Sequence, residues 1–420
     1  LAARAATATG VTLTLSGVQT AITLTAGGRY MFETHNFFGT ASKRRLYGCS
    51  GVHKAFEFDG TVYVPINHND ASRFPSQIAV FKEHLFLGVE SSVLHSGPGE
   101  PYKINAAAGG SEIALGDTVT NLIRQPGDAQ TGSLNITTRS NAWILYGTSP
   151  LNWNLVGLNV GVMGLAYTGS RLNQTYWLDD NGVTNLVASQ NFGNFDSAML
   201  TNRITSFIQS KRGFAVGSAV HREKSQYRLY FSDGSALYCT IVNGKLFGLM
   251  PQQLTDSFYC LWDGPSNDGK LYAGGSTSGY VYQLDVGTSF DGADINAYLI
   301  FNWNPIKSPR ILKRYRRASL EMEGGVFANI QFGYNLSYGR PGIPQDLGRS
   351  YEIGSSGVPF WDSFTWDSFF WDGNAATVLE TEMRGSGENV QIVLRSGTDY
   401  TPSYTVNSII LHHTPRRGLR

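Results

Sequence analysis

The feature that most constrains this chain is a loose repeat of short apolar runs joined by corners of small residues. Each unit has a polar start, an apolar run, a corner and a second apolar run. The runs are rich in Val, Ile, Thr, Tyr and Phe, which predicts β-strands, and helical signals are almost absent. A further apolar run precedes each unit, as in QIAVFK, SLNITT and MGLAYTG. The six units are KRRLYGCSGVHKAFEFDG, EHLFLGVESSVLHSG, NAWILYGTSPLNWNLVG, QTYWLDDNGVTNLVAS, QYRLYFSDGSALYCTI and GKLYAGGSTSGYVYQLD.

Asn-Gly and Asp-Gly pairs, the favoured two-residue turns of β-hairpins, punctuate these runs. The chain has 48 glycines in 420 residues, and only 15% of its residues are charged, whereas about 25% is usual. Many turns and few charges are typical of a β-rich protein. The turn pairs are Asp59-Gly60, Asn181-Gly182, Asp233-Gly234, Asn243-Gly244 and Asp268-Gly269.

The spacing of the units averages about 45 residues, which is the period of propeller blades. A blade is a small twisted sheet that cannot bury both faces alone, so blades pack on one another in a ring. We therefore predict an all-β chain with a β-propeller of about six blades over residues 1–290. A β-sandwich of meanders is the alternative for this region.

The pattern changes beyond residue 290. The segment PRILKRYRRASLEMEGG begins with basic residues and continues with Ala318, Leu320 and Met322 alternating with polar residues. Such alternation is typical of a sheet with one packed face and one wet face. Further strands are predicted in VFANIQFGYNL, ATVLETEMRG, ENVQIVLRS and YTVNSIILHH. We predict a C-terminal β-sandwich-like domain over residues 291–420, carrying an aromatic loop at residues 355–375.

The aromatic loop contains FWDSFTWDSFFWDG, a five-residue rhythm that matches neither a strand nor a helix. An Asp side chain favours a turn because its oxygen accepts a hydrogen bond from the backbone N–H two residues further on. The five-residue rhythm therefore predicts consecutive tight turns. The rings either form a small core under the loop, contact a neighbouring subunit, or stack on sugars. The interface candidates are Trp361, Trp366, Trp371, Phe364 and Phe369.

A basic run at the start of the second domain is the sharpest electrostatic feature. On a regular strand Arg314 and Arg316 share one face, with Lys313, Tyr315 and Arg317 on the other. Three interpretations remain open: a solvated edge strand, a contact with an acidic protein partner, or a contact with DNA phosphates. A channel through which DNA slides should avoid tight phosphate clamps. The patch consists of Arg310, Lys313, Arg314, Arg316 and Arg317.

No catalytic signature is present in the sequence, since HExxH, GxSxG, P-loop and GxGxxG motifs are all missing. The glycine-rich stretch 274–279 reads as a hairpin corner. A retaining glycosidase needs two carboxyl groups about 5 Å apart, and no pair can be nominated. The eight histidines lack metal-ligand spacing. We expect no enzyme activity, no catalytic or metal-binding residues and no cofactor.

The net charge of +1 gives no global field that would draw the chain onto nucleic acid or membrane. No apolar run approaches the roughly 18 residues of a membrane span, and the start lacks the pattern of a secretory leader. The three cysteines, Cys49, Cys239 and Cys260, are far apart, so we expect unpaired thiols made in a reducing cytosol. These features predict a soluble protein.

The repeated "xLYxG…hxFDG" units, KRYRRASLEMEG and the closing strand YTVNSIILHHTPRRG together resemble the tail nozzle proteins of short-tailed bacteriophages. This family is also called tail tubular protein B or packaged-DNA stabilisation protein. The resemblance spans most of the chain as architecture and includes no diagnostic signature.

The resemblance implies a structural virion protein in the tail, made in the host cytoplasm. Six copies would form a ring around the channel for double-stranded genome DNA, retaining the DNA and opening during ejection. Its partners would be the tail adaptor or connector ring and the tail fibre or tip proteins. The alternative from a different class is a carbohydrate-binding β-propeller, lectin-like or a glycosidase, acting in host attachment.

Overall fold

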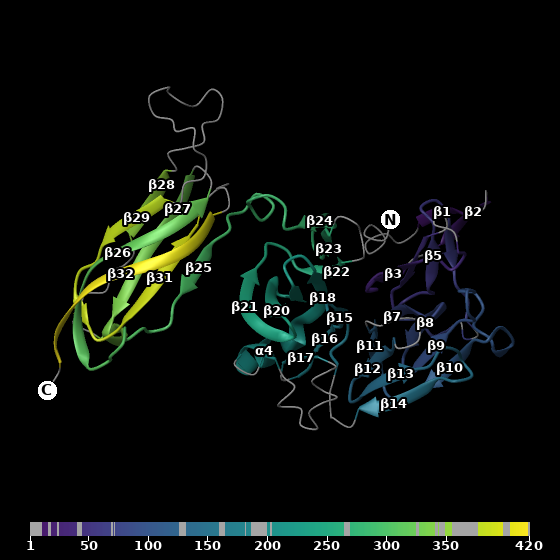
Figure 1. Cartoon of the computed structure of the whole chain (residues 1–420). Helices are drawn as coiled ribbons and strands as arrows, with labels where there is room; N and C mark the ends of the chain where they lie inside the picture. Colours follow the sequence, from purple (N-terminus) through teal and green to yellow (C-terminus); the bar gives the residue numbers. More distant parts are fainter. Residues whose placement is uncertain are drawn as a thin grey trace. The chain divides into compact units, whose positions relative to one another are not determined.

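The chain folds into two compact units, Leu1–Asp285 and Val286–Arg420, so the predicted boundary at residue 290 falls just beyond the first unit. In this computed structural model (Figure 1) the described residues are 11–418 with the following gaps. The gaps are 16–17, 23–24, 40–43, 69, 71, 126–131, 159–163, 181, 186–199, 202–203, 264–268, 325–326, 341–342, 344–348, 355–376 and 398–403.

The first unit contains six antiparallel meanders, one after another along the chain. The first is β3 (Met31–His35), β4 (Arg45–Cys49), β5 (Phe56–Phe58) and β6 (Tyr63–Pro65). The second is β7 (Gln77–Phe81), β8 (His84–Val89), β9 (Ser92–His95) and β10 (Ser111–Ala114). The third is β11 (Val119–Arg124), β12 (Leu134–Thr138), β13 (Ala142–Tyr146) and β14 (Asn154–Leu158).

The fourth meander is β15 (Ser170–Arg171), β16 (Thr175–Leu178) and β17 (Val183–Asn185). The fifth is β18 (Ala215–His221), β19 (Gln226–Phe231), β20 (Ser235–Val242) and β21 (Lys245–Gln253). The sixth is β22 (Phe258–Trp262), β23 (Leu271–Gly275) and β24 (Val281–Leu284). A separate hairpin of β1 (Val11–Leu15) and β2 (Val18–Ile22) precedes them, and a short helix, α4 (Thr205–Lys211), lies before the fifth.

The first strands of the six sheets form a closed ring. Each of β3, β7, β11, β15, β18 and β22 lies against the next, and β22 lies against β3. This arrangement is a six-bladed β-propeller, and it confirms the all-β propeller fold predicted from the repeat. Since every blade begins at its innermost strand, the six innermost strands run in the same direction along the propeller axis. Their C-terminal ends therefore meet at one mouth of the central channel.

Apolar side chains fill the spaces between consecutive blades. Tyr47 of the first blade packs with Ile78 and Leu85 of the second, and Trp177 of the fourth packs against Ile144 of the third. Similar clusters join the second blade to the third, the fourth to the fifth and the fifth to the sixth. Each blade thus covers a face of its neighbour, which is why the ring requires all of them.

The seam between the sixth and first blades is packed differently. Its buried cluster contains only Tyr30 and Phe56, with partly buried side chains including Phe32 and Cys260 around them. A cavity of about 810 Å³ adjoins it. No strand is shared between the first and last blades among the described residues, so the ring is closed there by side-chain contacts, including a hydrogen bond from the Cys260 thiol to the Tyr30 carbonyl oxygen.

Three of the five predicted hairpin turns lie where strands reverse, whereas Asn181 and Asp268 of the other two lie outside the described residues. Asp59-Gly60, Asp233-Gly234 and Asn243-Gly244 each connect two paired strands. Asn243 and Gly244 both have positive φ, at 51° and 73°, which matches a type I′ turn. Residues 276–280 connect β23 to β24, so the predicted corner at 274–279 begins within the last two residues of β23.

The third blade departs from the predicted order of strands. The run SLNITT was expected to lead the third unit, but it forms β12, and β11 (VTNLIR) lies inside it. In the other blades the two runs of each unit form the second and third strands, whereas here they form the third and fourth. Because one apolar run resembles another in sequence, the repeat alone could not show which strand position in the blade each run would occupy.

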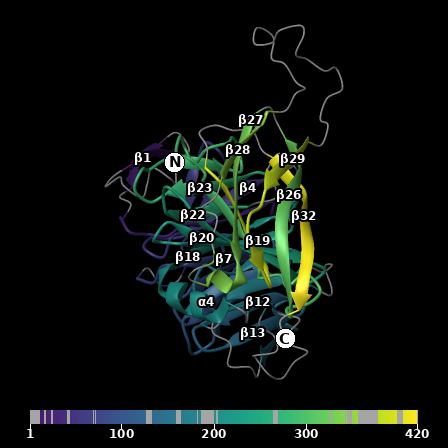
Figure 2. The same ribbon diagram turned by 90° about the vertical axis from the view of Figure 1, so that its left-hand side faces the viewer.

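The second unit is a β-sandwich. One sheet has the order β25 (Ala297–Ile300), β31 (Val390–Ser396), β27 (Phe327–Leu336) and β28 (Arg349–Gly354). In the other, β26 (Ile311–Gly324) pairs on one side with β32 (Tyr404–Gly418) and on the other with β29 (Thr377–Glu382) and β30 (Ser386–Gly387). The long β26 and β32 run alongside each other (Figure 2). Ala318, Leu320 and Met322 are buried in the core between the sheets, as the alternation predicted.

A buried ion pair joins the last strand of the propeller to the fifth blade. Arg228 in β19 is 1% exposed, and its guanidinium donates to both carboxylate oxygens of Asp285 at 3.0 and 2.6 Å. Lys224 also donates to Asp285 at 2.9 Å. Burial opposes ionisation of Asp285, but hydrogen bonds from Arg228 and Lys224 outweigh it and lower its pKa to about 2.

Asp285→Asn should destabilise the propeller by about 2–4 kcal/mol at pH 7, because it leaves the buried Arg228 charge without its carboxylate. The unfolded pKa of Asp is about 3.9, so the wild-type advantage is complete above that pH and is lost as pH falls toward 2. Chemical denaturation of the full chain at pH 7 and at pH 3 measures both effects. Glu90→Gln, at an exposed position, is the control; an equal loss in both variants would contradict the assignment.

Candidate functional site

The five aromatic interface candidates, Trp361, Trp366, Trp371, Phe364 and Phe369, lie outside the described residues. Their role therefore stays a prediction. The basic patch, in contrast, is described in full and lies at the start of β26 and just before it.

A β-bulge changes which face of the strand one of the basic side chains occupies, compared with the prediction for a regular strand. Opposite β32, Tyr315 pairs with His413 and Arg317 pairs with His412, so Arg316 is the extra residue. Lys313 and Tyr315 face inward and Arg314 and Arg316 outward, as predicted. The bulge turns Arg317 outward as well, which overturns its predicted place beside Lys313, since two residues here oppose one on the partner strand.

Lys313 is a buried structural residue, only 2% exposed. Its ammonium donates to the carbonyl oxygens of Ser308 at 2.7 Å, Ile311 at 3.0 Å and Glu388 at 3.0 Å. These three bonds use all the donors of an ammonium group. Lys313 therefore ties the loop before β26 to the loop before β31 and is not available to a partner.

The other four basic side chains are exposed. Arg317 donates to Glu380 at 3.1 Å across the strand pair. Arg310, Arg314 and Arg316 form no ion pair within the described residues. These three remain candidates for contact with an acidic partner.

The edge strand β25 exposes apolar side chains on both of its faces. Tyr298 is 70% exposed, Leu299 51% and Ile300 52%. Leu299 pairs with Leu394, which is buried in the core, so Leu299 is on the core-facing side of the sheet. The opposite sheet does not cover β25, and no described strand pairs with its outer edge.

A cavity of about 400 Å³ continues this uncovered region. Its apolar lining includes Phe301 and Trp303 after β25, Ile392 of β31 and Leu411 of β32. The sandwich thus has an open end between its two sheets, where apolar surface and an unpaired strand edge lie together. Such surface is typical of a contact between proteins.

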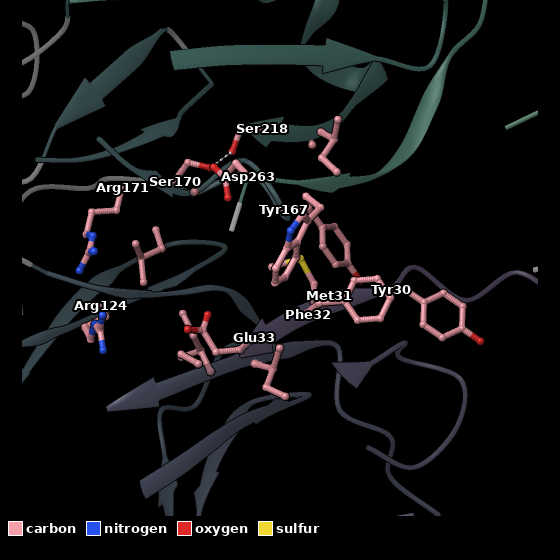
Figure 3. Close-up of a pocket in the computed structure, with 18 of the residues that line it drawn as sticks. Tyr30, Met31, Phe32, Glu33, Arg124, Tyr167, Ser170, Arg171, Ser218 and Asp263 are labelled. Atoms are coloured by element: carbon pink, nitrogen blue, oxygen red, sulfur yellow. Dashed lines mark hydrogen bonds between the residues drawn. The ribbon is translucent and has the colours of Figure 1, made fainter. Parts of the chain in front are cut away.

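The propeller contains a second candidate site in its central channel. A cavity of about 250 Å³ is lined by residues of all six innermost strands and of the segments flanking them (Figure 3). A water molecule occupies about 30 Å³, so the cavity is of the size of a small ligand. Duplex DNA does not fit in it.

Charged residues converge on the mouth where the innermost strands end. Arg124 ends β11, Arg171 ends β15, Arg222 follows β18 and Asp263 follows β22. Glu33 points into the channel from β3 (Figure 3). The inside of a blade is apolar, so a charge on an innermost strand is tolerated where the strand opens to water.

The charges at this mouth influence one another. Burial raises the pKa of Glu33 to about 7; Arg124 opposes the rise and Asp263 adds to it. Burial, together with repulsion from Arg124 and Arg222, lowers the pKa of the Arg171 guanidinium. Arg171 is therefore close enough to Arg124 and Arg222 to be repelled by both, beside a carboxyl group whose pKa burial has raised.

Few of these groups are paired. Asp263 accepts a hydrogen bond from the backbone N–H of Val220 at 2.8 Å. Within the described part of the chain, no carboxylate lies within 4.0 Å of the guanidinium groups of Arg124, Arg171 or Arg222. All three residues line the channel cavity.

The opposite end of the channel is aromatic. The Arg29 guanidinium lies 4.2 Å from the centre of the Tyr167 ring and 5.8 Å from that of Tyr259. Burial lowers the pKa of Arg29 to about 10. Its Nη2 atom is buried without a hydrogen-bond partner.

None of the channel residues was predicted from the sequence to belong to a functional site. The signal was present in part, since LIR, VHR and LWD each end an apolar run with a charge. It became meaningful only once the innermost strands were known, and of those six strands only β7 lies within one of the predicted runs quoted above. No metal site is indicated among the described residues, where no three His, Cys, Asp or Glu side chains are grouped to hold an ion.

Comparison with known proteins adds little about function. No protein-family model matches the chain, and no curated protein matches it. Similar solved structures include BBS1N in complex with ARL6DN (14% identity, 63% of this chain and 81% of that chain, TM-score 0.39). YCF48 bound to D1 peptide is 11% identical over 66% of this chain and 84% of that chain, with TM-score 0.39. Chaetomium thermophilum Sqt1, bound to the N-terminus of ribosomal protein L10, is 13% identical over 59% and 66%, with TM-score 0.38.

Lys313→Met should loosen the sandwich, because three carbonyl oxygens lose a charged donor at a cost of about 1–3 kcal/mol. Arg314→Met, one residue along the same strand but exposed, should cost less than about 0.5 kcal/mol. Hydrogen–deuterium exchange of the full chain measures both, and peptides covering β26 should exchange faster only in the Lys313 variant. Equal exchange in the two variants would show that Lys313 has no special structural role.

Proposed function

We propose that this chain is a structural subunit that assembles with copies of itself through the open end of its sandwich. The observation that carries the proposal is β25, whose Tyr298, Leu299 and Ile300 are all more than half exposed on a strand with an unpaired edge. Burying these side chains against a second copy would remove apolar area from water and pair the edge. The net charge of +1 means that little repulsion opposes self-association.

The resemblance found in the sequence specifies the assembly as a tail nozzle. In this proposal six copies form a ring around the DNA exit channel of a virion, retain the packaged genome and open during ejection. The exposed Arg310, Arg314 and Arg316 would contact an acidic neighbour such as an adaptor ring. The DNA path would lie between subunits, since the channel inside one propeller holds only about 250 Å³. Finding the gene beside portal or adaptor genes would support this assignment.

No helix in the described part of the chain is long and apolar enough to cross a bilayer.

Leu299→Lys should weaken self-association at least tenfold, because a lysine on an edge strand blocks pairing and its burial costs more than about 1.4 kcal/mol. Ile410→Lys is a matched control, since Ile410 is also an apolar strand residue of the same unit and is also 51% exposed. Sedimentation velocity over a range of concentrations, with electron microscopy of the largest species, should show rings for the wild type and the control. A wild-type chain that stays monomeric throughout, or an equal effect of both variants, would refute β25 as the assembly surface.

The seam between the sixth and first blades favours carbohydrate binding as a second candidate function. Its cavity of about 810 Å³ is lined by Phe32, Trp262, Tyr272 and Tyr280 among others, and Tyr280 is 67% exposed. Aromatic faces of this kind can stack on sugar rings. The apolar lining is equally suited to closing the ring, which is the simpler role.

A glycan array separates the two functions. A structural subunit should bind no glycan in a saturable manner. If glycans do bind, and Tyr280→Ala abolishes binding while Phe247→Ala does not, carbohydrate recognition replaces assembly as the leading function. Phe247 is a suitable control because it is 85% exposed and does not line the groove.

A further inference from the structure

The charged mouth of the propeller channel belongs to the first unit, whereas the proposed assembly surface belongs to the second, and the chemistry of the mouth does not depend on the proposed assembly. Arg124, Arg171 and Arg222 reach it from three different blades (Figure 3 labels the first two). None of the three has a carboxylate partner within the described residues. Converging arginines without partners are costly in a channel unless an anion joins them, because the like charges repel one another.

We propose that this mouth binds a compact tetrahedral oxyanion, either free phosphate or sulfate or the terminal phosphate of a small ester. Such an ion has four oxygen acceptors, and guanidinium groups bind them in a bidentate manner. A carboxylate offers about four acceptor sites, fewer than the six donors of three bidentate guanidinium groups, so it would satisfy the three arginines less completely. The cavity of about 250 Å³ accommodates an ion of this size and excludes a nucleic-acid duplex.

The two acidic groups of the mouth are compatible with an anion. Asp263 is already engaged by the backbone N–H of Val220 at 2.8 Å. Glu33 is close to Arg124, Asp263, Arg171 and Arg44, and burial keeps much of it protonated near pH 7. In that form its carboxyl group donates a hydrogen bond instead of repelling the anion. When Glu33 is protonated, three arginines against the single carboxylate of Asp263 leave the mouth positive.

Isothermal titration calorimetry of the full chain with inorganic phosphate tests the site. The wild type should bind one equivalent saturably, and Arg171→Gln and Arg124→Gln should each weaken binding about tenfold or more. Arg124 is exposed, so its variant should fold even if the Arg171 variant does not. Arg139→Gln is the control, because Arg139 is exposed and does not line the channel. Absence of saturable binding, or an equal loss in the control, would overturn the proposal.

Two further arms define the ligand and the role of Glu33. Tighter binding of glycerol 2-phosphate than of inorganic phosphate identifies an ester as the ligand, and equal or weaker binding identifies the free ion. Sulfate keeps a constant charge between about pH 6 and pH 8, so its affinity reports the protein alone. It should fall at least threefold as Glu33 ionises, and in Glu33→Gln it should not change. A pH-independent affinity in the wild type would remove Glu33 from the site.

Discussion

Apolar packing between neighbouring blades is the interaction on which the propeller depends. A blade of three or four short strands has two apolar faces, and neither can be covered from within the blade. The clusters around Tyr47, Trp177 and Leu229 each draw side chains from two consecutive blades. Removing one blade would therefore expose two faces, and the stability of each blade depends on its neighbours.

The same packing decides where charge can lie. Facing blades exclude water along most of each innermost strand, so charged side chains occur where the strands open to the channel mouth. Arg124 and Arg171 both end their strands. The fold thus gathers charges that are far apart in the sequence into one small space, although no single segment of the chain contains a recognisable site.

The sequence predicted the features that depend on local pattern. Alternation predicted the strands and the buried face of β26, Asn-Gly and Asp-Gly pairs predicted the turns, and the repeat predicted the six-bladed ring. It failed where the outcome depends on how strands pair. The bulge at Arg316 reorients Arg317 without any local signal, and the burial of Lys313 depends on the carbonyl of Glu388, which is distant in the chain. The channel residues became visible only when the strand order was known, and the aromatic loop lies outside the described residues.

The unshared seam has a consequence for how the chain is made. Cys260 of the sixth blade lies 3.7 Å from the carbonyl oxygen of Tyr30, across 230 positions of sequence. During synthesis, at about 5–20 residues per second, the first blade emerges long before the partner that completes its outer surface. Until then the nascent chain exposes an apolar blade face at each end of the incomplete ring. Closing the ring joins residues far apart in the sequence, so its loop-closure entropy must be overcome in a single late step. Ribosome-bound intermediates of this protein are thus at their greatest risk of aggregation just before the last blade emerges.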